Sequence, residues 1–417
     1  MNYLEEVMQA ICIALLVANF LLNIGRTLKA IELCNESLLL LSNKVLSVQK
    51  PLQQRMYRKI YHTMFKAYCR VSDHSNAIAC GRKLLNIHHE CCDAGQEGVL
   101  SIALAQIYQS QSMYAEAKEL YGRAILVMQK TSDRRGEAIA FGGLGNLFTL
   151  LGEYVKAEKY HEKALAISVE IGDRAIEGKC YGNLGNVFHS LCEYIKAKEY
   201  YEKALAISME IGDRANEGTC YGNLGNVLES LGEYVKAKEY YEKALAISME
   251  IGDRAKEGTW YGNLGNVFLS LGEYVKAKEY YEKALAISME IGDRANEGSL
   301  YGNLGTVFYR LGEYVKAKEY YEKALAISRE IGKQTDQAHT YLSLASVFLD
   351  LREYRQSKLF CDNALEIIMK IGDKEGQAQY HLTEGDFHKY LGDKDKAKAC
   401  FEKGLAIAVE IGNRSIK

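Results

Sequence analysis

Asparagine recurs along the chain at a fixed spacing of forty residues. It stands at Asn146, Asn186, Asn226 and Asn266, and Thr306 is the next residue in the series. A side-chain amide offers two hydrogen-bond donors and an acceptor, which match the polar groups of a peptide backbone. The row therefore predicts a site for an extended peptide, in which each hydrogen bond contributes about 0.5–1.5 kcal/mol net.

Residues that differ between near-identical copies of the surrounding sequence stand beside this row. Lys179, Gly182, Asn186 and His189 are separated by steps of three, four and three, so a helix would place them on one face. The glycine costs helix stability at a non-core position, which indicates that space is needed there. We expect the varying residues to set selectivity for the peptide. They are Lys179, His189, Glu229, Leu269 and Tyr309.

A second candidate for chemistry is the run His88-His89-Glu90-Cys91-Cys92, whose residue types bind metals. Adjacent residues on a helix point in different directions, and the run lacks the paired C-x-x-C spacing of zinc sites. We interpret it as the end of a helix that carries structural thiols. The sequence therefore predicts no metal site.

A third candidate is the glycine-containing stretch Gly182-Asn183-Leu184-Gly185-Asn186. It lacks the G-x-x-x-x-G-K-[ST] pattern of a phosphate-binding loop, and it lies inside a helical pattern instead of following a strand. No constellation of Ser, His and Asp or pair of carboxylates stands out from the rest of the sequence. We therefore expect no cofactor, no small-molecule substrate and no enzymatic activity.

The elements that position these residues are helices in a forty-residue repeat. From Tyr181 the chain reads YGNLGNVFHSLCEYIKAKEYYEKALAISMEIGDRANEGTC, and near copies begin at Tyr221, Tyr261 and Tyr301. Apolar residues recur at steps of three and four in both halves, which is typical of two helices. Gly212 and Asp213 suit the end of the second helix and the cap of the next one. Each repeat is predicted to be an antiparallel helix pair.

The repeat resembles the tetratricopeptide repeat. Its signature of aromatic and small residues is found here at Tyr181, Leu184-Gly185, Phe188, Ala197, Tyr201 and Ala204. The usual repeat has thirty-four residues and a Pro near its end, whereas this one has forty and places Met209 there. The resemblance implies that the first-helix face with the Asn row lines the inside of a superhelix.

The expected fold is all-α: a right-handed α-solenoid of about ten antiparallel helix pairs. We divide the chain into three degenerate repeats over residues 1–131, five near-identical repeats over 132–331 and two diverged repeats over 332–417. One irregular connection is expected around Leu41 to Gln54, the stretch that holds the single proline, Pro51.

Composition narrows the partners and the compartment. The 52 Lys and Arg residues balance 54 Asp and Glu residues, so no global field attracts nucleic acid or an anionic membrane. The eleven cysteines are scattered and odd in number, which favours free thiols in a reducing compartment. We therefore predict a cytoplasmic protein that binds a protein partner and neither nucleic acid nor membrane.

The apolar run from Ile11 to Leu22 is compatible with a signal peptide or membrane anchor. It is short for a membrane span, and Glu5 and Glu6 precede it in place of basic residues. Ala30 and Leu38 then fit the small and apolar positions of a second helix. We interpret the run as the first helix of a degenerate repeat.

The forty-residue unit with GDRAxEG followed by YGNLGN also resembles the Partner-of-Inscuteable (Pins/LGN) family and related TPR-28-like arrays of animals. The resemblance covers nearly all of residues 95–411. It implies that the groove holds extended peptides of spindle-orientation partners through the inner-wall asparagines. The family often has Arg where this chain has Lys179, Thr219, Thr259 and Ser299, and its GoLoco motifs are not found here.

Three functions follow from the sequence. The first is a non-enzymatic scaffold or adaptor that binds an extended peptide in the concave groove. The second is a Pins/LGN-like regulator of cell polarity, spindle orientation or signalling. The third is the recognition portion of a larger effector or enzyme whose catalytic domain lies elsewhere.

Overall fold

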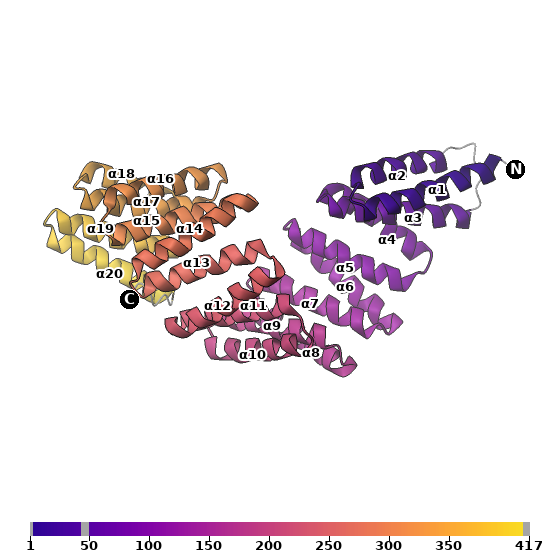
Figure 1. Cartoon of the computed structure of the whole chain (residues 1–417), viewed down its shortest axis with the longest axis horizontal. Coiled ribbons are helices and arrows are strands. Elements are labelled where there is room, and N and C mark those ends of the chain that lie inside the picture. The colour runs from indigo at the N-terminus through magenta and orange to yellow at the C-terminus, as the bar shows by residue number, and fades with distance from the viewer. Residues whose placement is uncertain (1–2, 43–49, 412–417) are drawn as a thin grey trace. The chain divides into compact units, whose positions relative to one another are not determined.

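The chain folds into helix pairs, as predicted. The structure, a computed structural model, describes residues 3–42 and 50–411, and all regular secondary structure within these ranges is α-helical. The chain divides into two compact units, residues 1–212 and residues 213–417. Each odd-numbered helix packs against the even-numbered helix that follows it (Figure 1).

The N-terminal unit contains α1 (Tyr3–Asn23), α2 (Thr27–Ser42), α3 (Lys50–Arg70), α4 (His74–Glu90), α5 (Ala94–Ser110), α6 (Tyr114–Thr131), α7 (Arg134–Leu150), α8 (Tyr154–Ile171), α9 (Arg174–Ser190) and α10 (Tyr194–Glu210). The C-terminal unit contains α11 (Arg214–Ser230), α12 (Tyr234–Ile251), α13 (Arg254–Ser270), α14 (Tyr274–Ile291), α15 (Arg294–Arg310), α16 (Tyr314–Glu330), α17 (Gln334–Asp350), α18 (Tyr354–Ile371), α19 (Lys374–Tyr390) and α20 (Lys394–Glu410).

Caps and turns explain where the helices begin and end. Asp213 accepts a hydrogen bond from the backbone N–H of Asn216 at 3.0 Å, and this N-cap recurs in most first helices. Gly212 has a φ of +69°, the left-handed conformation that closes the helix before it. The turn inside each pair also needs positive φ, and Cys192 adopts it at +59° where most other repeats have Gly. The boundaries predicted from the repeat are therefore confirmed.

An arginine joins the two ends of each near-identical repeat. In α13, Arg254 forms ion pairs with the buried Glu257 of its own helix and with Glu290 at the end of the following helix, α14. The hydrogen bond from this guanidinium holds the pKa of Glu290 below its ordinary value. The Arg and the two Glu recur every forty residues from Arg134 to Arg294. These bridges explain the GDRAxEG motif.

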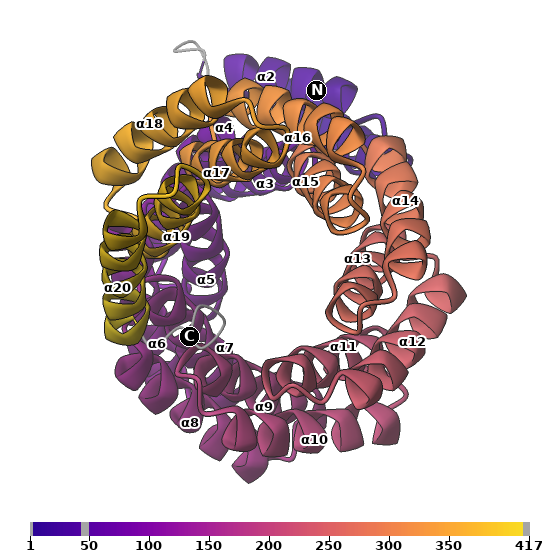
Figure 2. The ribbon, with the colours of Figure 1, turned by 90° about the vertical axis from the view of Figure 1, so that its left-hand side faces the viewer.

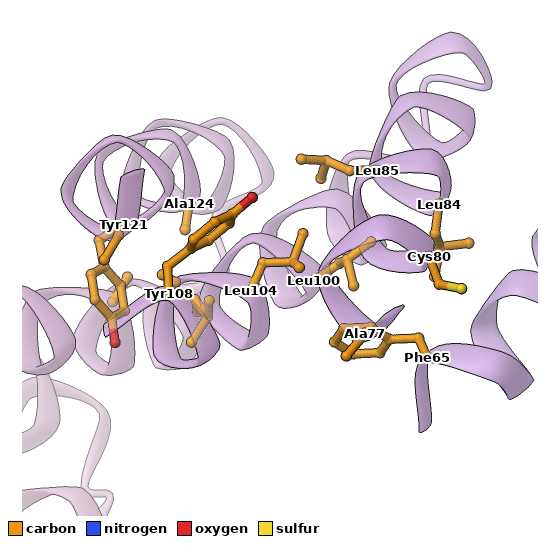
Figure 3. Close-up of a cluster of buried hydrophobic side chains, with 14 of the residues drawn as sticks. Phe65, Ala77, Cys80, Leu84, Leu85, Leu100, Leu104, Tyr108, Tyr121 and Ala124 are labelled. Carbon is orange, nitrogen blue, oxygen red and sulfur yellow. The ribbon is translucent and has the colours of Figure 1, made fainter. Parts of the chain in front are cut away.

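The core of the N-terminal unit continues from one helix pair to the next. Leu104 of α5 reaches across to α4, where a Cβ on Gly81 would lie 2.5 Å from the leucine Cδ2. Phe65 of α3 approaches the same glycine, and Tyr108 and Tyr121 continue the buried cluster (Figure 3). Because each pair buries its apolar face against its neighbours, the array stacks as a solenoid.

The N-terminal apolar run forms α1, which packs against α2 and α3 and buries Ile11, Leu15 and Leu22. Leu16 and Phe20 remain exposed. By length and composition Glu5–Asn23 is also able to cross a membrane, with a hydropathy of 1.7 and 22% of the stretch buried. The expected irregular connection is located in part: Pro51 lies in the first turn of α3, and residues 43–49 are outside the described ranges.

First helices lie on the inner side of each unit and second helices on the outer side. In the C-terminal unit α13, α15, α17 and α19 line the inner side, and α14, α16, α18 and α20 lie outside them (Figure 2). In the N-terminal unit α5, α7 and α9 lie inside α6, α8 and α10. We call the surface of these first helices the inner wall.

Candidate functional site: the inner wall

The Asn row lies on first helices, as the repeat frame predicts. Asn146 of α7 and Asn186 of α9 are exposed, and Asn226 of α11 and Asn266 of α13 are half-buried. Thr306 occupies the next position, on α15. The row is thus divided between the two units, with two asparagines in each.

Three of the asparagines are oriented by a tyrosine from the second helix of the same repeat. The Tyr201 hydroxyl donates to Oδ1 of Asn186 at 2.7 Å, and Tyr281 donates to Oδ1 of Asn266 at the same distance. Tyr241 does so for Asn226. This hydrogen bond occupies an amide acceptor, whereas the Nδ2 donors of the three residues have no partner among the described residues. The row therefore presents donors.

A glycine next to each asparagine makes room for the tyrosine ring. A Cβ on Gly185 would lie 2.5 Å from Cε1 of Tyr201, and a Cβ on Gly265 would lie 2.6 Å from the ring of Tyr281. Distances this short leave space only for a hydrogen, so glycine is required. Gly, Asn and Tyr therefore form one structural unit in each of these repeats. The sequence pattern contains all three residues but does not predict that they are in contact.

Four of the residues predicted to set selectivity occupy one position of the repeat and are half-buried: His189, Glu229, Leu269 and Tyr309. His189 packs edge-on against Tyr194, with ring centroids 5.5 Å apart, and burial lowers the pKa of this histidine. Tyr309 packs against Tyr314 at the same separation. Leu269 joins the apolar cluster around Phe268. This position therefore contacts its own second helix as well as the inner wall.

Glu229 holds the same position in α11 and adds a carboxylate to the Asn–Tyr pair. Its Oε2 lies 2.7 Å from the Tyr241 hydroxyl, which also contacts Oδ1 of Asn226. Burial raises the pKa of Glu229, although the hydrogen bond from Tyr241 opposes the shift. A hydroxyl has only one proton, so Asn226 and Glu229 compete for it.

Lys179 is exposed and lies beside a cavity of about 490 Å³ in the N-terminal unit. The cavity spans the inner wall from α5 to α9, and Asn146 and Asn183 also line it. Gly142 and Gly143 line it as well, at positions where most neighbouring repeats have Gly-Asn. The structure therefore brings Lys179 and Asn146 together.

Three further cavities, of about 250, 390 and 570 Å³, lie along α15, α17 and α19. The first two share Thr306, Tyr321, His339 and Ser343, and the second and third share Tyr309 and Ser346. Of the residues that line these cavities, the sequence predicts Tyr309 as a site residue but none of those on α17. The sequence feature that could have identified them is the departure of residues 333–350 from the repeat, which by itself indicates only divergence.

The prediction that the inner-wall glycines leave open space holds for some repeats only. A Cβ on Gly142, Gly182 or Gly302 would meet nothing within 4 Å. At Gly222, however, it would lie 2.0 Å from Cη2 of Trp260, which reaches over from α13. That glycine accommodates a neighbouring side chain and leaves no space in the wall.

The run of possible metal ligands at the end of α4 is not gathered into a site. His88 is buried, whereas Cys91 and Cys92 are exposed at the helix end and in the following turn. Within residues 3–42 and 50–411, no group of three or more His, Cys, Asp or Glu side chains is arranged to hold a metal ion.

Solved structures similar to this one are also helical arrays. A signal-transduction ATPase from Pyrococcus horikoshii with a tetratricopeptide repeat sensor is 18% identical, with a TM-score of 0.64 over 91% of this chain and 56% of that one. The quorum sensor NprR of B. thuringiensis is 15% identical, with a TM-score of 0.61 over 81% of this chain and 97% of that one.

A Rap protein complexed with Competence and Sporulation Factor is 15% identical, with a TM-score of 0.53 over 88% of this chain and 99% of that one. Identities this low establish a shared fold alone. The comparison with curated proteins gave no match.

Family models match most of the repeats directly. One tetratricopeptide repeat model covers residues 96–170, 179–250 and 256–330, and a second covers residues 378–408. The first model alone accounts for more than half of the 417 residues. The chain therefore belongs to the tetratricopeptide repeat family.

Proposed function

We propose that the chain is a non-enzymatic scaffold that binds an extended peptide of a protein partner along its inner wall. The observation that carries the proposal is the orientation of the Asn row. Because Tyr201, Tyr241 and Tyr281 occupy the amide acceptors, the Nδ2 groups are left as donors spaced one repeat apart. Backbone carbonyls of an extended chain supply the acceptors that such donors need.

Selectivity is proposed to come from the residues next to the row. Lys179 and His189 give the repeat that begins with α9 a cation and an imidazole, and the next three repeats have a carboxylate, an aliphatic chain and a phenol at Glu229, Leu269 and Tyr309. A peptide that threads past them meets a different side chain at each repeat. Among the fold neighbours, the Rap protein was solved in complex with Competence and Sporulation Factor.

The chain itself offers a variant that tests the Asn row without disturbing its support. Thr306 replaces Asn, and its hydroxyl lies 3.0 Å from the Tyr321 hydroxyl, so threonine keeps the tyrosine paired but lacks the amide donors. We therefore substitute Thr for Asn at 146, 186, 226 and 266. Phage carrying random peptides are selected on the wild-type chain, and the enriched peptides are then measured on both proteins.

The proposal predicts that enriched peptides bind the wild type and lose at least about tenfold in affinity on the variant, which corresponds to about 1.4 kcal/mol. Both proteins should keep the same helicity and melting temperature. Equal binding to the two proteins, or the absence of any enriched peptide, would overturn the proposal.

Two other functions remain hypotheses. The Pins/LGN-like role in polarity, spindle orientation or signalling rests on the sequence resemblance, and none of the comparisons adds to it. The role as the recognition portion of a larger protein gains one observation: the chain spans 56% of the signal-transduction ATPase that carries a repeat sensor.

A further inference from the structure

The cavity between α5, α7 and α9 lies beside two departures from the repeat. In α13, Asn263 donates from Nδ2 to Oδ1 of Asn226 at 3.3 Å and so fills the space between consecutive first helices. The equivalent residue in α7 is Gly143, and the residue that it would meet on α5 is Gln106. A Cβ on Gly143 would lie 2.3 Å from the ring of Tyr121, so this ring occupies the space directly over the glycine, and the cavity of about 490 Å³ lies beside it.

The second departure lies under the same wall. His161 replaces the tyrosine of the other near-identical repeats and is fully buried beneath Gly145. Neither of its ring nitrogens has a hydrogen-bond partner. No tyrosine hydroxyl therefore reaches Asn146, so this amide keeps its acceptor as well as its donors for a ligand.

The cavity is lined by both apolar and cationic residues. Ala138, Ile139 and Ile176 line it beside the two glycines, and the aromatic contribution comes from Tyr121. Arg135 and Lys179 supply positive charge, and no Asp or Glu is among the described residues that line the cavity. Nε of Arg135 contacts Asp173 at 2.8 Å, whereas Lys179 forms no ion pair among the described residues.

Three cavities of the C-terminal unit, those along α15, α17 and α19, have acidic residues in their lining. Asp336, Glu375, Asp350 and Asp386 are among the residues that line them. A further cavity, at α19 and α20, is lined by Lys389, Lys394, Lys398 and Glu402. Among the described residues that line these cavities, only those of the N-terminal one combine cations with no Asp or Glu, which favours an acidic segment of a ligand there.

We propose that this cavity is an anchor pocket for a large aliphatic side chain of the bound peptide, with an Asp or Glu within two residues of it paired to Lys179 and Arg135. The inference rests on the proposed function and names the chemistry of its ligand. A few buried anchors contribute most of the affinity of protein interfaces, and the aliphatic lining of the cavity suits such an anchor.

Two substitutions at one glycine test the pocket. Gly142→Leu fills the cavity, and a Cβ at this residue meets nothing within 4 Å, so the helix accommodates the change. Gly142→Ala is the matched control, because it removes the same glycine and leaves most of the space. With peptides enriched on the wild-type chain, Gly142→Leu should lower affinity at least about tenfold, and Gly142→Ala by less than about twofold.

A charge reversal tests the acidic flank. Selection on Lys179→Glu should replace the Asp and Glu that flank the aliphatic residue by Lys and Arg. Thr219→Glu, at the equivalent position of α11, should leave the flanking residues of the enriched peptides unchanged.

The results separate this inference from the proposed function. Peptides that depend on the Asn row but are indifferent to Gly142→Leu, or that lack an acidic residue beside an aliphatic one, would overturn the anchor pocket and leave the peptide-binding role intact. Peptides indifferent to the Asn row would overturn the peptide-binding role itself.

Discussion

The helix pairs of α11–α16 and the pair of α17 and α18 share one backbone plan but are held together differently. In α15, Asp293 caps the helix and Arg294 bridges Glu297 and Glu330. In α17 the same positions hold Lys333, Gln334 and Gln337, the cap makes no side-chain hydrogen bond, and Gln337 bonds to a backbone carbonyl instead.

The inner wall changes at the same point. The Gly-Asn pair with its tyrosine becomes Ala345 and Ser346 with Cys361, and all three cavities along α15, α17 and α19 include residues of α17. In the N-terminal unit the cavity is lined by Gly143, which departs from the repeat. The comparison teaches that these four cavities border departures from the repeat, although Gly182 and Gly302 of the regular repeats also face open space.

The largest effect is expected from breaking the Gly–Tyr contact of a regular repeat. Gly265→Ala places a methyl group 2.6 Å from the Tyr281 ring and should cost about 1–3 kcal/mol of unfolding free energy. Gly262→Ala, in the same helix, meets only Leu300 at 3.8 Å and should stabilise by about 0.4–1 kcal/mol. Denaturant unfolding followed by the fluorescence of Trp260, the single tryptophan, measures both.

The α17 repeat supplies the compensating change for this variant. Ala345 stands at the glycine position, and the facing residue is Cys361 in place of tyrosine. Tyr281→Cys should therefore cost less stability in the presence of Gly265→Ala than in the wild type. Additive losses would show that the two positions are independent and would contradict the comparison.

The second effect concerns the departure in the N-terminal unit. His161→Tyr should raise stability by about 1–3 kcal/mol, because the histidine buries two unpaired ring nitrogens and tyrosine restores the hydroxyl beside Asn146. Thermal unfolding followed by circular dichroism measures the change. A loss of stability would show that the repeat has adapted to the smaller ring.

The same substitution has a pH dependence of known sign. Burial lowers the pKa of His161 from 6.5 to about 4. Between these values the unfolded chain binds more protons than the folded one, so stability is lost as the pH falls from 6.5 toward 4. His161→Tyr should remove this part of the acid sensitivity, and an unchanged pH profile would contradict the assignment.

The smallest effect is expected at the ion pairs. Arg254→Gln removes the one cation that pairs with both Glu257 and Glu290 and should lower the melting temperature, with a difference that shrinks at high salt. Gln334→Ala, at the equivalent position of α17, should leave the melting temperature unchanged. Equal shifts for the two variants would show that the bridges do not distinguish the regions.

The fold could be predicted from the sequence because several near-identical repeats carry the same helical pattern. The near-identical copies share the same apolar spacing, the same Asp cap and nearly the same turn. The Gly-Asp pair found at Gly212 and Asp213 therefore predicts the boundary between consecutive repeats wherever it recurs in these copies. The sequence also placed the Asn row on the correct helices. Contacts between helices could not be predicted from the sequence pattern. The hydrogen bond from Tyr201 to Asn186, for example, joins residues that are fifteen positions apart and lie on different helices. The cavity beside Gly143 is lined by residues of α5, α6, α7 and α9, and the pattern within one repeat does not show which of them meet.

The central claim is that the Nδ2 groups of the Asn row are donors to a bound peptide. It is tested most directly by the side-chain amide NMR spectrum of the chain isotope-labelled only at asparagine, recorded with and without an enriched peptide. Substitution by threonine assigns the signals. The account predicts that the Nδ2 signals of Asn226 and Asn266 shift on binding. Unchanged signals at saturation would contradict it.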